Sequence, residues 1–276
     1  MTKPIASGRA AADVADPYAQ IAEWYDLEHD SFSDDIELYL ELVGGETSRL
    51  AILEVGAGTG RLLAALAGAG YVATGVEPSA AMRERCVRRI ETLPERVARR
   101  IHIVEGTATA LGLPTTERFD VALLGLGTFG HLTRVEERSA ALGALRAQLK
   151  QGGQLIVDVD LAGPRRLLET AGRLWWQGAW QARDGATLVE HLVVGAAGAE
   201  PGVVEVTHLY DAHEQGGPVR RTLTRTPLAL LSRGEVALAV QQAGFTIEAL
   251  YGGYDLAPAD DTAGRVIVLA RRGASV

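Results

Sequence analysis

The chain has very little cysteine and lysine. Among its 276 residues, Cys86 is the single cysteine, and Lys3 and Lys150 are the two lysines. One thiol excludes an intrachain disulfide and a site built from several thiolate metal ligands. No apolar run reaches membrane-spanning length, and none follows a charged start. The sequence therefore predicts a cytoplasmic protein with no membrane partner and no metal site, and it leaves little room for a catalytic lysine.

Excess positive charge is also missing. The formal net charge is −8, which argues against a broad phosphate-binding surface and therefore against a nucleic-acid partner. The densest basic segment, residues 83–100, interleaves arginine with glutamate, a pattern that favours a solvated helix face. The length and the 47% hydrophobic content allow either one α/β domain with an elaboration or two domains.

What the chain does have is a glycine-rich turn after an apolar run. Leu50–Val55 is a short apolar segment that predicts a buried strand, and 61–67 has a helical pattern. Glycines alternate with small residues at 56, 58 and 60. A strand that turns through glycines into a helix brings backbone N–H groups and a positive helix end close to a ligand. This stretch therefore predicts a nucleotide or cofactor site.

The spacing of the glycines separates two cofactor classes. A dinucleotide turn needs G-x-G-x-x-G, but the sixth position counted from Gly56 is Arg61, and counted from Gly58 it is Leu63. Instead, Glu54 lies two residues before three alternating glycines. This pattern resembles the first motif of class I S-adenosylmethionine-dependent methyltransferases. The acid suits a cofactor whose methionine part carries an ammonium. The alternative is a turn that merely packs a helix against a sheet.

Two later stretches extend the resemblance. Tyr71–Glu77 is a second strand-like run, and Glu77 lies 21 residues after Gly56, so its carboxylate can accept both ribose hydroxyls of an adenosine. Ser79 is a candidate N-cap for a helix over 80–90. The resemblance places Met82, on the first turn of this helix, against adenine, although Met82 is equally suited to fill the core.

The third strand, 100–104, is followed by Thr107 where the family usually has an acid that bonds the adenine amino group. A threonine hydroxyl can accept the same hydrogen bond without a charge. The resemblance as a whole implies a cofactor site formed by Tyr18, Glu54, Gly56, Ala57, Gly58, Gly60, Arg61, Glu77, Pro78, Met82, Gly106, Thr107, Ala108, Gly125 and Leu126.

The acceptor is expected at the tip of the fourth strand, 119–125. In the family this tip meets the acceptor, which implies that Thr128, Phe129 and His131 lie at the reacting methyl group. His131 could take a proton from an amine, although a lone histidine in a turn is often only a loop partner. Thr133 and Glu136 predict a capping box for a helix that runs through 149.

The N-terminal region predicts a helical lid. A helical pattern begins at Asp16-Pro17, and an acidic break over 26–35 contains His29. In the methyltransferases that this chain resembles, a tyrosine-rich N-terminal helix folds over the cofactor. That likeness implies Tyr18, Tyr25 and His29 as acceptor-pocket residues, with Tyr25 and His131 as the catalytic candidates. Alternatively, the tyrosines simply fasten the helix to the domain.

The second half predicts a fifth strand, an insertion and a family-like ending. The turn over 150–153 leads into a strand over 154–161, where Asp158 and Asp160 share one face and suit a rim role. Four strand-like runs over 173–182, 187–194, 203–210 and 219–226 predict an antiparallel sheet that covers the acceptor pocket or pairs two subunits. Ser232 and Glu235 predict a capped helix ending at 243–244, followed by strands over 245–251 and 265–270.

The predicted fold is α/β, with a Rossmann-like seven-stranded methyltransferase sheet whose last strand is antiparallel, an inserted antiparallel sheet and the lid. The expected organisation is a flexible arm over 1–16, the lid over 17–45, the methyltransferase core over 46–162 and 228–276, and the insertion over 163–227. The order of elements resembles bacterial amino-sugar and glycine-type N-methyltransferases. It implies a small-molecule amine acceptor, in-line transfer without metal and a possible homodimer. Oxygen or carbon acceptors and an inactive scaffold protein remain alternatives.

Overall fold

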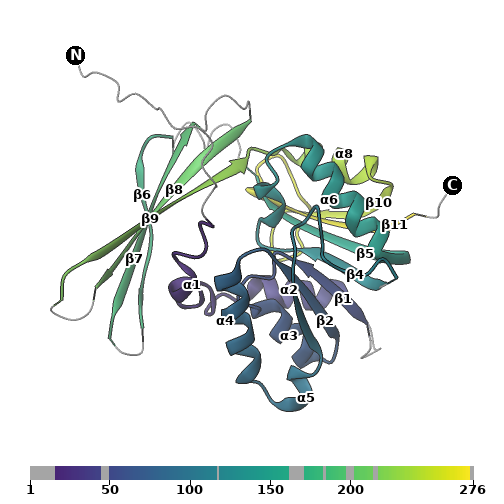
Figure 1. Ribbon diagram of the computed structural model, residues 1–276. Helices are drawn as coiled ribbons and strands as arrows, with labels where there is room; N and C mark the ends of the chain where they lie inside the picture. Colours follow the sequence, from purple (N-terminus) through teal and green to yellow (C-terminus); the bar gives the residue numbers. More distant parts are fainter. Residues whose placement is uncertain are drawn as a thin grey trace.

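The protein contains two separate β-sheets joined by helices (Figure 1). One sheet has seven strands and the other has four antiparallel strands, which confirms the predicted fold class. None of the described helices is both long and apolar enough to cross a membrane. The computed structural model describes residues 16–44, 50–116, 118–161, 171–182, 185–196, 202–213 and 217–273.

The large sheet has the strand order β10-β11-β5-β4-β1-β2-β3. Strands β1 to β5 run parallel, and β11 runs antiparallel to both β5 and β10. The predicted antiparallel last strand is therefore confirmed. The strands are β1 Ala51–Val55, β2 Val72–Glu77, β3 Ile101–Glu105, β4 Phe119–Leu124, β5 Leu149–Asp160, β10 Phe245–Tyr251 and β11 Arg265–Arg272.

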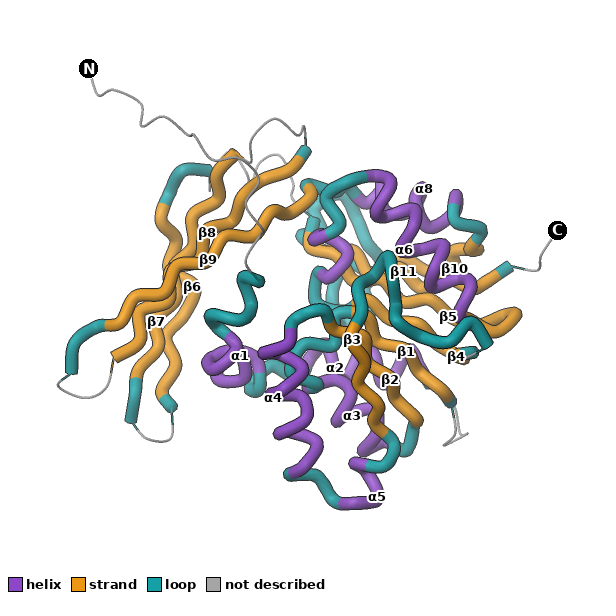
Figure 2. Tube along the Cα trace, in the orientation of Figure 1, coloured by secondary structure: helices purple, strands orange, loops and turns teal. Residues whose placement is uncertain are grey.

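Helices cover both faces of the large sheet (Figure 2). Alternate residues of β1 show this arrangement, since Ile52 packs in one buried cluster with α3 and Leu53 in another with α6 and α8. Burial on both faces explains why the central strands are continuous apolar runs. The helices are α1 Ala22–His29, α2 Asp34–Val43, α3 Arg61–Ala69, α4 Ala80–Glu91, α5 Glu95–Ala98, the 3₁₀ helix η1 Thr128–His131, α6 Val135–Gln148 and α8 Arg233–Gln242.

Two predicted helix caps are confirmed. The Ser79 hydroxyl accepts the backbone N–H of Met82 at 3.3 Å at the start of α4. At the start of α8, Ser232 and Glu235 form the reciprocal capping box, with the Glu235 N–H donating to Ser232 Oγ at 3.2 Å and the Ser232 N–H donating to Glu235 Oε2 at 2.8 Å. Local side chains therefore satisfy the first free N–H groups of both helices.

Three local predictions are wrong. The acidic break is shorter than expected because α1 continues to His29, stabilised by arginines of α4 that bind its aspartates. Helix α6 begins one residue later than predicted, since Glu137, not Glu136, accepts the backbone N–H of Arg134 at 3.1 Å. Finally, residues 150–153 do not form a turn. They belong to β5, whose register with β4 shifts between the pairs 119↔149 and 121↔154 and so absorbs the extra residues.

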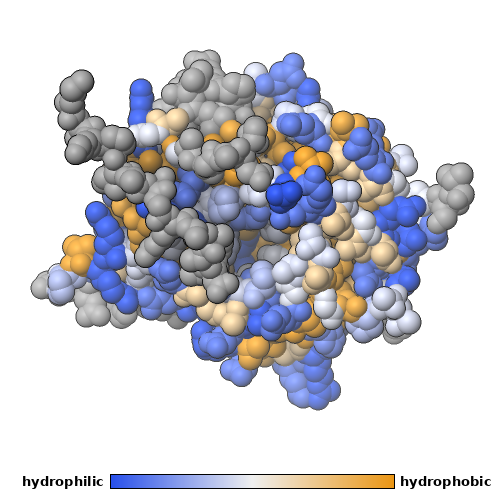
Figure 3. Space-filling model, turned by 45° about the horizontal axis from the view of Figure 1, so that its top comes forward, coloured by the Kyte–Doolittle hydropathy of each residue, from blue (hydrophilic) through white to orange (hydrophobic). Residues whose placement is uncertain are grey.

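The small sheet stands apart from the large one, with α1 between them (Figures 1 and 2). A buried cluster of Ile21, Leu188 and Tyr210 joins α1 to one face, whereas Leu174 and Trp176 are 61% and 64% exposed. Figure 3 shows hydrophilic and hydrophobic residues mixed over the molecular face that it presents. The sheet has the order β6-β7-β8-β9, with β6 Leu174–Gln181, β7 Thr187–Ala196, β8 Val203–His213 and β9 Arg220–Ala229.

The predicted domain boundaries stay predictions. Those at 46 and at 162–163 lie outside the described residues, as does nearly all of the predicted flexible arm. The predicted end of the insertion, at 227, lies inside β9.

Candidate active site

A cavity of about 440 Å³ lies where the chain leaves strands β1, β2, β3 and β4, and the N-terminal segment closes part of it. Parallel α/β sheets bind ligands at this edge, beyond the carboxyl ends of their strands. The structure brings together at this cavity most of the residues predicted from the sequence. Those that line it are Tyr18, Tyr25, Glu54, Gly56, Ala57, Gly58, Arg61, Glu77, Pro78, Met82, Gly106, Thr107, Ala108, Gly125, Leu126, Thr128 and His131.

Three predicted residues lie elsewhere. Phe129 is fully buried in the core cluster on the other side of η1. His29 stacks on Tyr25 with ring centroids 4.1 Å apart, behind the ring that lines the cavity. Gly60 is the N-cap of α3, and a Cβ added there would lie 2.5 Å from the Cys86 sulfur. This glycine therefore permits the close approach of α3 and α4.

The glycine turn is fastened to the end of β2. The N–H groups of Gly56 and Ala57 both donate to the carbonyl of Val76, at 2.8 and 3.2 Å, and the Gly58 N–H donates to Glu77 Oε2 at 2.9 Å. A Cβ on Gly56 would lie 2.6 Å from the Thr128 hydroxyl. The turn thus brings the ends of β1 and β2 and the start of η1 around one space.

Two buried carboxylates face this space. Burial raises the pKa of Glu54 well above its usual range, and its Oε2 has no hydrogen-bond partner among the described residues. Burial also raises the pKa of Glu77, while backbone N–H groups of Ser79 and Gly58 oppose that rise. A buried carboxylate oxygen without a donor is unfavourable by itself. Glu54 therefore offers a place for a positively charged donor.

At the end of the cavity where the resemblance places adenine, the Thr107 hydroxyl already has protein partners. It accepts the Ala110 N–H at 3.1 Å and lies 3.2 Å from the hydroxyl of Thr109. Met82 lines the cavity and is 2% exposed, so the wall on this side is mostly apolar and carries little charge.

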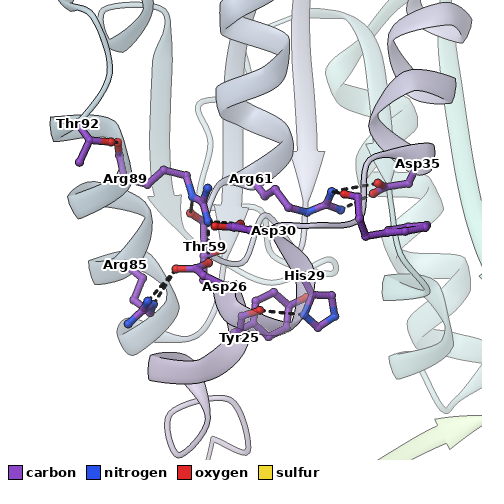
Figure 4. Close-up of polar contacts among 11 residues, drawn as sticks. Tyr25, Asp26, His29, Asp30, Asp35, Thr59, Arg61, Arg85, Arg89 and Thr92 are labelled. Atoms are coloured by element: carbon purple, nitrogen blue, oxygen red, sulfur yellow. Dashed lines mark hydrogen bonds and ion pairs between the residues drawn. The ribbon is translucent and has the colours of Figure 1, made fainter. Parts of the chain in front are cut away.

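Arg61 has a partner that the sequence did not reveal. Its guanidinium donates to both carboxylate oxygens of Asp35, at 3.0 Å for Oδ1, and to the carbonyl of Phe32 at 2.7 Å (Figure 4). Asp35 is fully buried and lines the cavity. The pair joins the start of α3 to the start of α2 across 26 residues, and a single sequence gives no sign of such a pairing.

Helix α1 is held against α4 by a second set of ion pairs (Figure 4). Arg85 and Arg89 both bind Asp26, at 2.8 and 2.7 Å, and Arg89 also binds Asp30 at 2.7 Å. The Arg89 Nε donates to the carbonyl of Thr59 in the glycine turn at 3.0 Å. The basic segment predicted to be a solvated face is therefore only partly so, because two of its arginines bind aspartates at the end of α1.

At the other end of the cavity, Tyr18 meets His131. The Tyr18 hydroxyl lies 3.1 Å from His131 Nε2. Burial, and then the neighbouring His208, lowers the pKa of His131 to about 4, while burial raises the pKa of Tyr18. Both side chains are therefore uncharged at neutral pH, and this part of the wall is aromatic and neutral.

The small sheet adds a polar group behind His131. His208 Nδ1 lies 2.6 Å from Glu190 Oε1, and the His208 ring stacks on Tyr210 with centroids 6.0 Å apart. Burial and the neighbouring Glu190 raise the pKa of Glu28 to about 8. These contacts join α1 to β7 and β8, and apart from the number of histidines no sequence pattern indicates them. The described residues contain no cluster of three or more side chains suited to hold a metal ion.

Asp158 and Asp160 do share one side of β5, but the predicted rim role is wrong for Asp158, which is fully buried. Arg265 binds both carboxylates. The hydroxyl groups of Tyr39 and Tyr254 also donate to Asp158.

Comparison with known proteins identifies the class. A methyltransferase domain family matches residues 52–153. An uncharacterized methyltransferase from Geobacillus sp. (strain WCH70) is 30% identical over 142 residues, 51% of this chain and 62% of that relative. The CcbJ methyltransferase from Streptomyces caelestis has a TM-score of 0.72 at 20% identity, covering 95% of this chain and 100% of the other. The sugar N-methyltransferase KedS8 from Streptoalloteichus sp. ATCC 53650 has a TM-score of 0.64 at 22% identity, covering 99% of this chain and 98% of the other.

The chain thus spans 62% of the length of the Geobacillus relative, and its likeness to the two solved structures is one of fold. The match over residues 52–153, the seven-stranded sheet and the glycine turn identify a methyltransferase domain with the class I S-adenosylmethionine-dependent fold, as the sequence predicts. S-adenosylmethionine is the cofactor of this class.

Proposed function

We propose that this protein transfers the methyl group of S-adenosylmethionine to an amine nitrogen of a small molecule. The observation that carries the proposal is the cavity itself, which has a buried, donor-free carboxylate oxygen of Glu54 at one part and a neutral aromatic wall of Tyr18 and His131 at another. The first suits the cofactor and the second suits an uncharged amine.

The residues at the cavity fit the cofactor. Glu54 would hold the ammonium of the methionine part, Glu77 retains free lone pairs for the ribose hydroxyls, and Met82 would pack on adenine. The Thr107 hydroxyl is already occupied by Ala110 and Thr109, so the adenine amino group would gain little from it. When bound, the cofactor supplies a sulfonium methyl group that is already activated for attack.

The protein's part is then to orient the acceptor and exclude water. An amine attacks only when it is uncharged, and a neutral, poorly solvated wall disfavours the ammonium form. His131, with a pKa of about 4, is neutral and too weakly basic to retain a proton. Its ring and the Tyr18 hydroxyl would hold the amine N–H by hydrogen bonds, and the proton would leave to solvent after transfer.

The likeness to a sugar N-methyltransferase supports an amine acceptor. An inactive scaffold protein is disfavoured, because a binding module has no need for a buried, unpaired Glu54. A role for the small sheet in pairing two subunits stays a prediction.

Calorimetric titration with S-adenosylmethionine, S-adenosylhomocysteine and NADH tests the cofactor, and we expect the first two to bind and NADH not to bind. Mass spectrometry on matched amino and hydroxyl sugars then tests the acceptor. Methylation of the hydroxyl compounds alone would refute the amine assignment, and binding of NADH alone would refute the class of reaction.

A further inference from the structure

The turn after β4 contains a leucine in an unfavourable backbone conformation. Leu126 has φ 44°, and among the described residues Leu256 is the other non-glycine residue with positive φ. A left-handed conformation is unfavourable for an ordinary L-residue, so the surroundings must hold Leu126 in place. Leu126 lines the cavity between Gly125 and Thr128, where η1 begins. Its conformation therefore sets the direction in which η1, with His131, leaves the sheet.

Tyr39 of α2 holds this turn. Its hydroxyl accepts the backbone N–H of Leu126 at 3.2 Å and donates to the carboxylate of Asp158. Burial and the Asp158 carboxylate raise the pKa of Tyr39, so the hydroxyl keeps its proton for Asp158 and its lone pairs for Leu126. The ring is fully buried, and a Cβ on Gly125 would lie 3.3 Å from its oxygen. Tyr39 thus fits closely against the turn.

Asp158 is itself fixed from several sides. Arg265 binds its Oδ1, Tyr254 donates to its Oδ2 at 3.0 Å, and its backbone carbonyl accepts the N–H of Gly127 at 3.2 Å. The side chain and the backbone of one residue on β5 therefore hold two successive amides of the turn, one of them through Tyr39. A well-supported carboxylate of this kind fixes the position of the hydroxyl that it accepts.

We propose that Tyr39, oriented by Asp158, is a positioning residue for methyl transfer, which holds Leu126 in its left-handed conformation and thereby fixes Thr128 and His131, which follow it, at the acceptor side of the cavity. This inference rests on the proposed function. In-line transfer depends on alignment to within a fraction of an ångström. Release of Leu126 would relax the turn and shift His131 while leaving Glu54 and Glu77, at the ends of other strands, in place.

The chain offers a matched pair of variants. Tyr39→Phe and Tyr254→Phe each remove one hydroxyl that donates to the same Asp158 oxygen, but Tyr39 alone of the two bonds Leu126. We expect Tyr39→Phe to lower kcat by about ten- to a hundredfold, with a smaller loss of affinity for S-adenosylmethionine, because Glu54 and Glu77 lie at the ends of other strands. Tyr254→Phe should keep kcat near the wild-type value, because Arg265 still binds Asp158 and the Tyr39 bond to Leu126 is intact. Equal losses of kcat in the two variants would overturn the proposal.

A second measurement needs neither cofactor nor acceptor. Hydrogen exchange of the Leu126 amide in the free protein should become faster in Tyr39→Phe and stay unchanged in Tyr254→Phe. Unchanged protection in Tyr39→Phe would overturn the proposal whatever the activity of the enzyme. If the wild-type protein methylates a hydroxyl and not an amine, the proposed acceptor is wrong, while the same kcat comparison with that hydroxyl acceptor still decides the role of Tyr39.

Discussion

The two sheets of this molecule are covered in different ways. The central strands of the large sheet are buried on both faces, and β1, β2 and β4 end at the cavity. The small sheet is covered by α1 on one face and leaves Leu174 and Trp176 exposed. It approaches the cavity through α1 and η1. The large sheet therefore supplies the backbone and carboxylate groups that we assign to the cofactor, and the small sheet packs on the side where we place the acceptor.

The largest expected effect tests the cofactor side. Gly58→Asp should abolish measurable S-adenosylmethionine binding, because Gly58 has φ 55° and its N–H bonds Glu77, so a third carboxylate would join two buried ones. Calorimetry measures the loss. Gly143→Asp is the matched control, since a Cβ there meets nothing within 4 Å. Retained affinity in Gly58→Asp would remove the glycine turn from the cofactor site.

Glu54→Gln should weaken S-adenosylmethionine binding and, at high pH, raise the stability of the free protein. Loss of a charged hydrogen-bond acceptor should weaken S-adenosylmethionine binding by about 10- to 100-fold. The folded-state pKa of Glu54 is raised, so its burial lowers stability as pH rises above the unfolded value of about 4.3. The variant should therefore melt at a higher temperature than wild type at pH 8, with a smaller difference at pH 5. A lower melting temperature at pH 8 would contradict this account of the orphaned oxygen.

On the acceptor side, Tyr18→Phe removes the hydroxyl next to His131. We expect kcat/KM for the acceptor to fall by about 3- to 10-fold, the value of one ordinary hydrogen bond. The resemblance also assigns Tyr18 to the cofactor site, but we expect the Kd of S-adenosylmethionine to stay unchanged, because the Tyr18 hydroxyl lies against His131 and the cofactor carboxylates lie on the large sheet. A parallel loss of cofactor affinity would contradict the assignment of the cofactor to the large sheet and of the acceptor to the opposite side of the cavity.

The smallest effect concerns the junction between α1 and the small sheet. The folded-state pKa of Glu28 is about 8, raised by burial and by Glu190. Its favourable contribution is therefore complete below about pH 4.3 and is lost as pH rises to about 8. We expect local hydrogen exchange in α1 to become faster over this interval, beyond the intrinsic pH dependence of exchange, and Glu28→Gln to flatten the change. Glu23→Gln, at a more exposed position of the same helix, is the control, and it should leave the pH dependence of exchange unchanged.

Much of the fold could be predicted because its determinants are local. The apolar runs gave the strands, Ser79 and Ser232 gave helix starts, and the glycine turn gave the cofactor class. The errors at 26–35 and 150–153 arose where distant partners decided the local structure, namely the arginines of α4 and the pairing of β5 with β4.

The candidate site was predicted from the motifs that surround it, and its supporting residues were missed. Asp35 bonds Arg61 across 26 positions, and Tyr39 bonds Asp158 across 119. Neither pair leaves a periodic or compositional signal in one sequence. Phe129 was assigned to the acceptor because the resemblance places the acceptor at the tip of the fourth strand, but its ring is buried in the core.

Arg89 links α1 to the glycine turn, and this link bears on how fast the cavity can release a bound molecule. It joins Asp26 and Asp30 to the Thr59 carbonyl in the glycine turn at the cavity, so any separation of α1 from this turn has to break these partly exposed ion pairs. Ions in solution screen such pairs. The residence time of bound S-adenosylhomocysteine should therefore shorten as ionic strength rises, and repeated turnover should become faster.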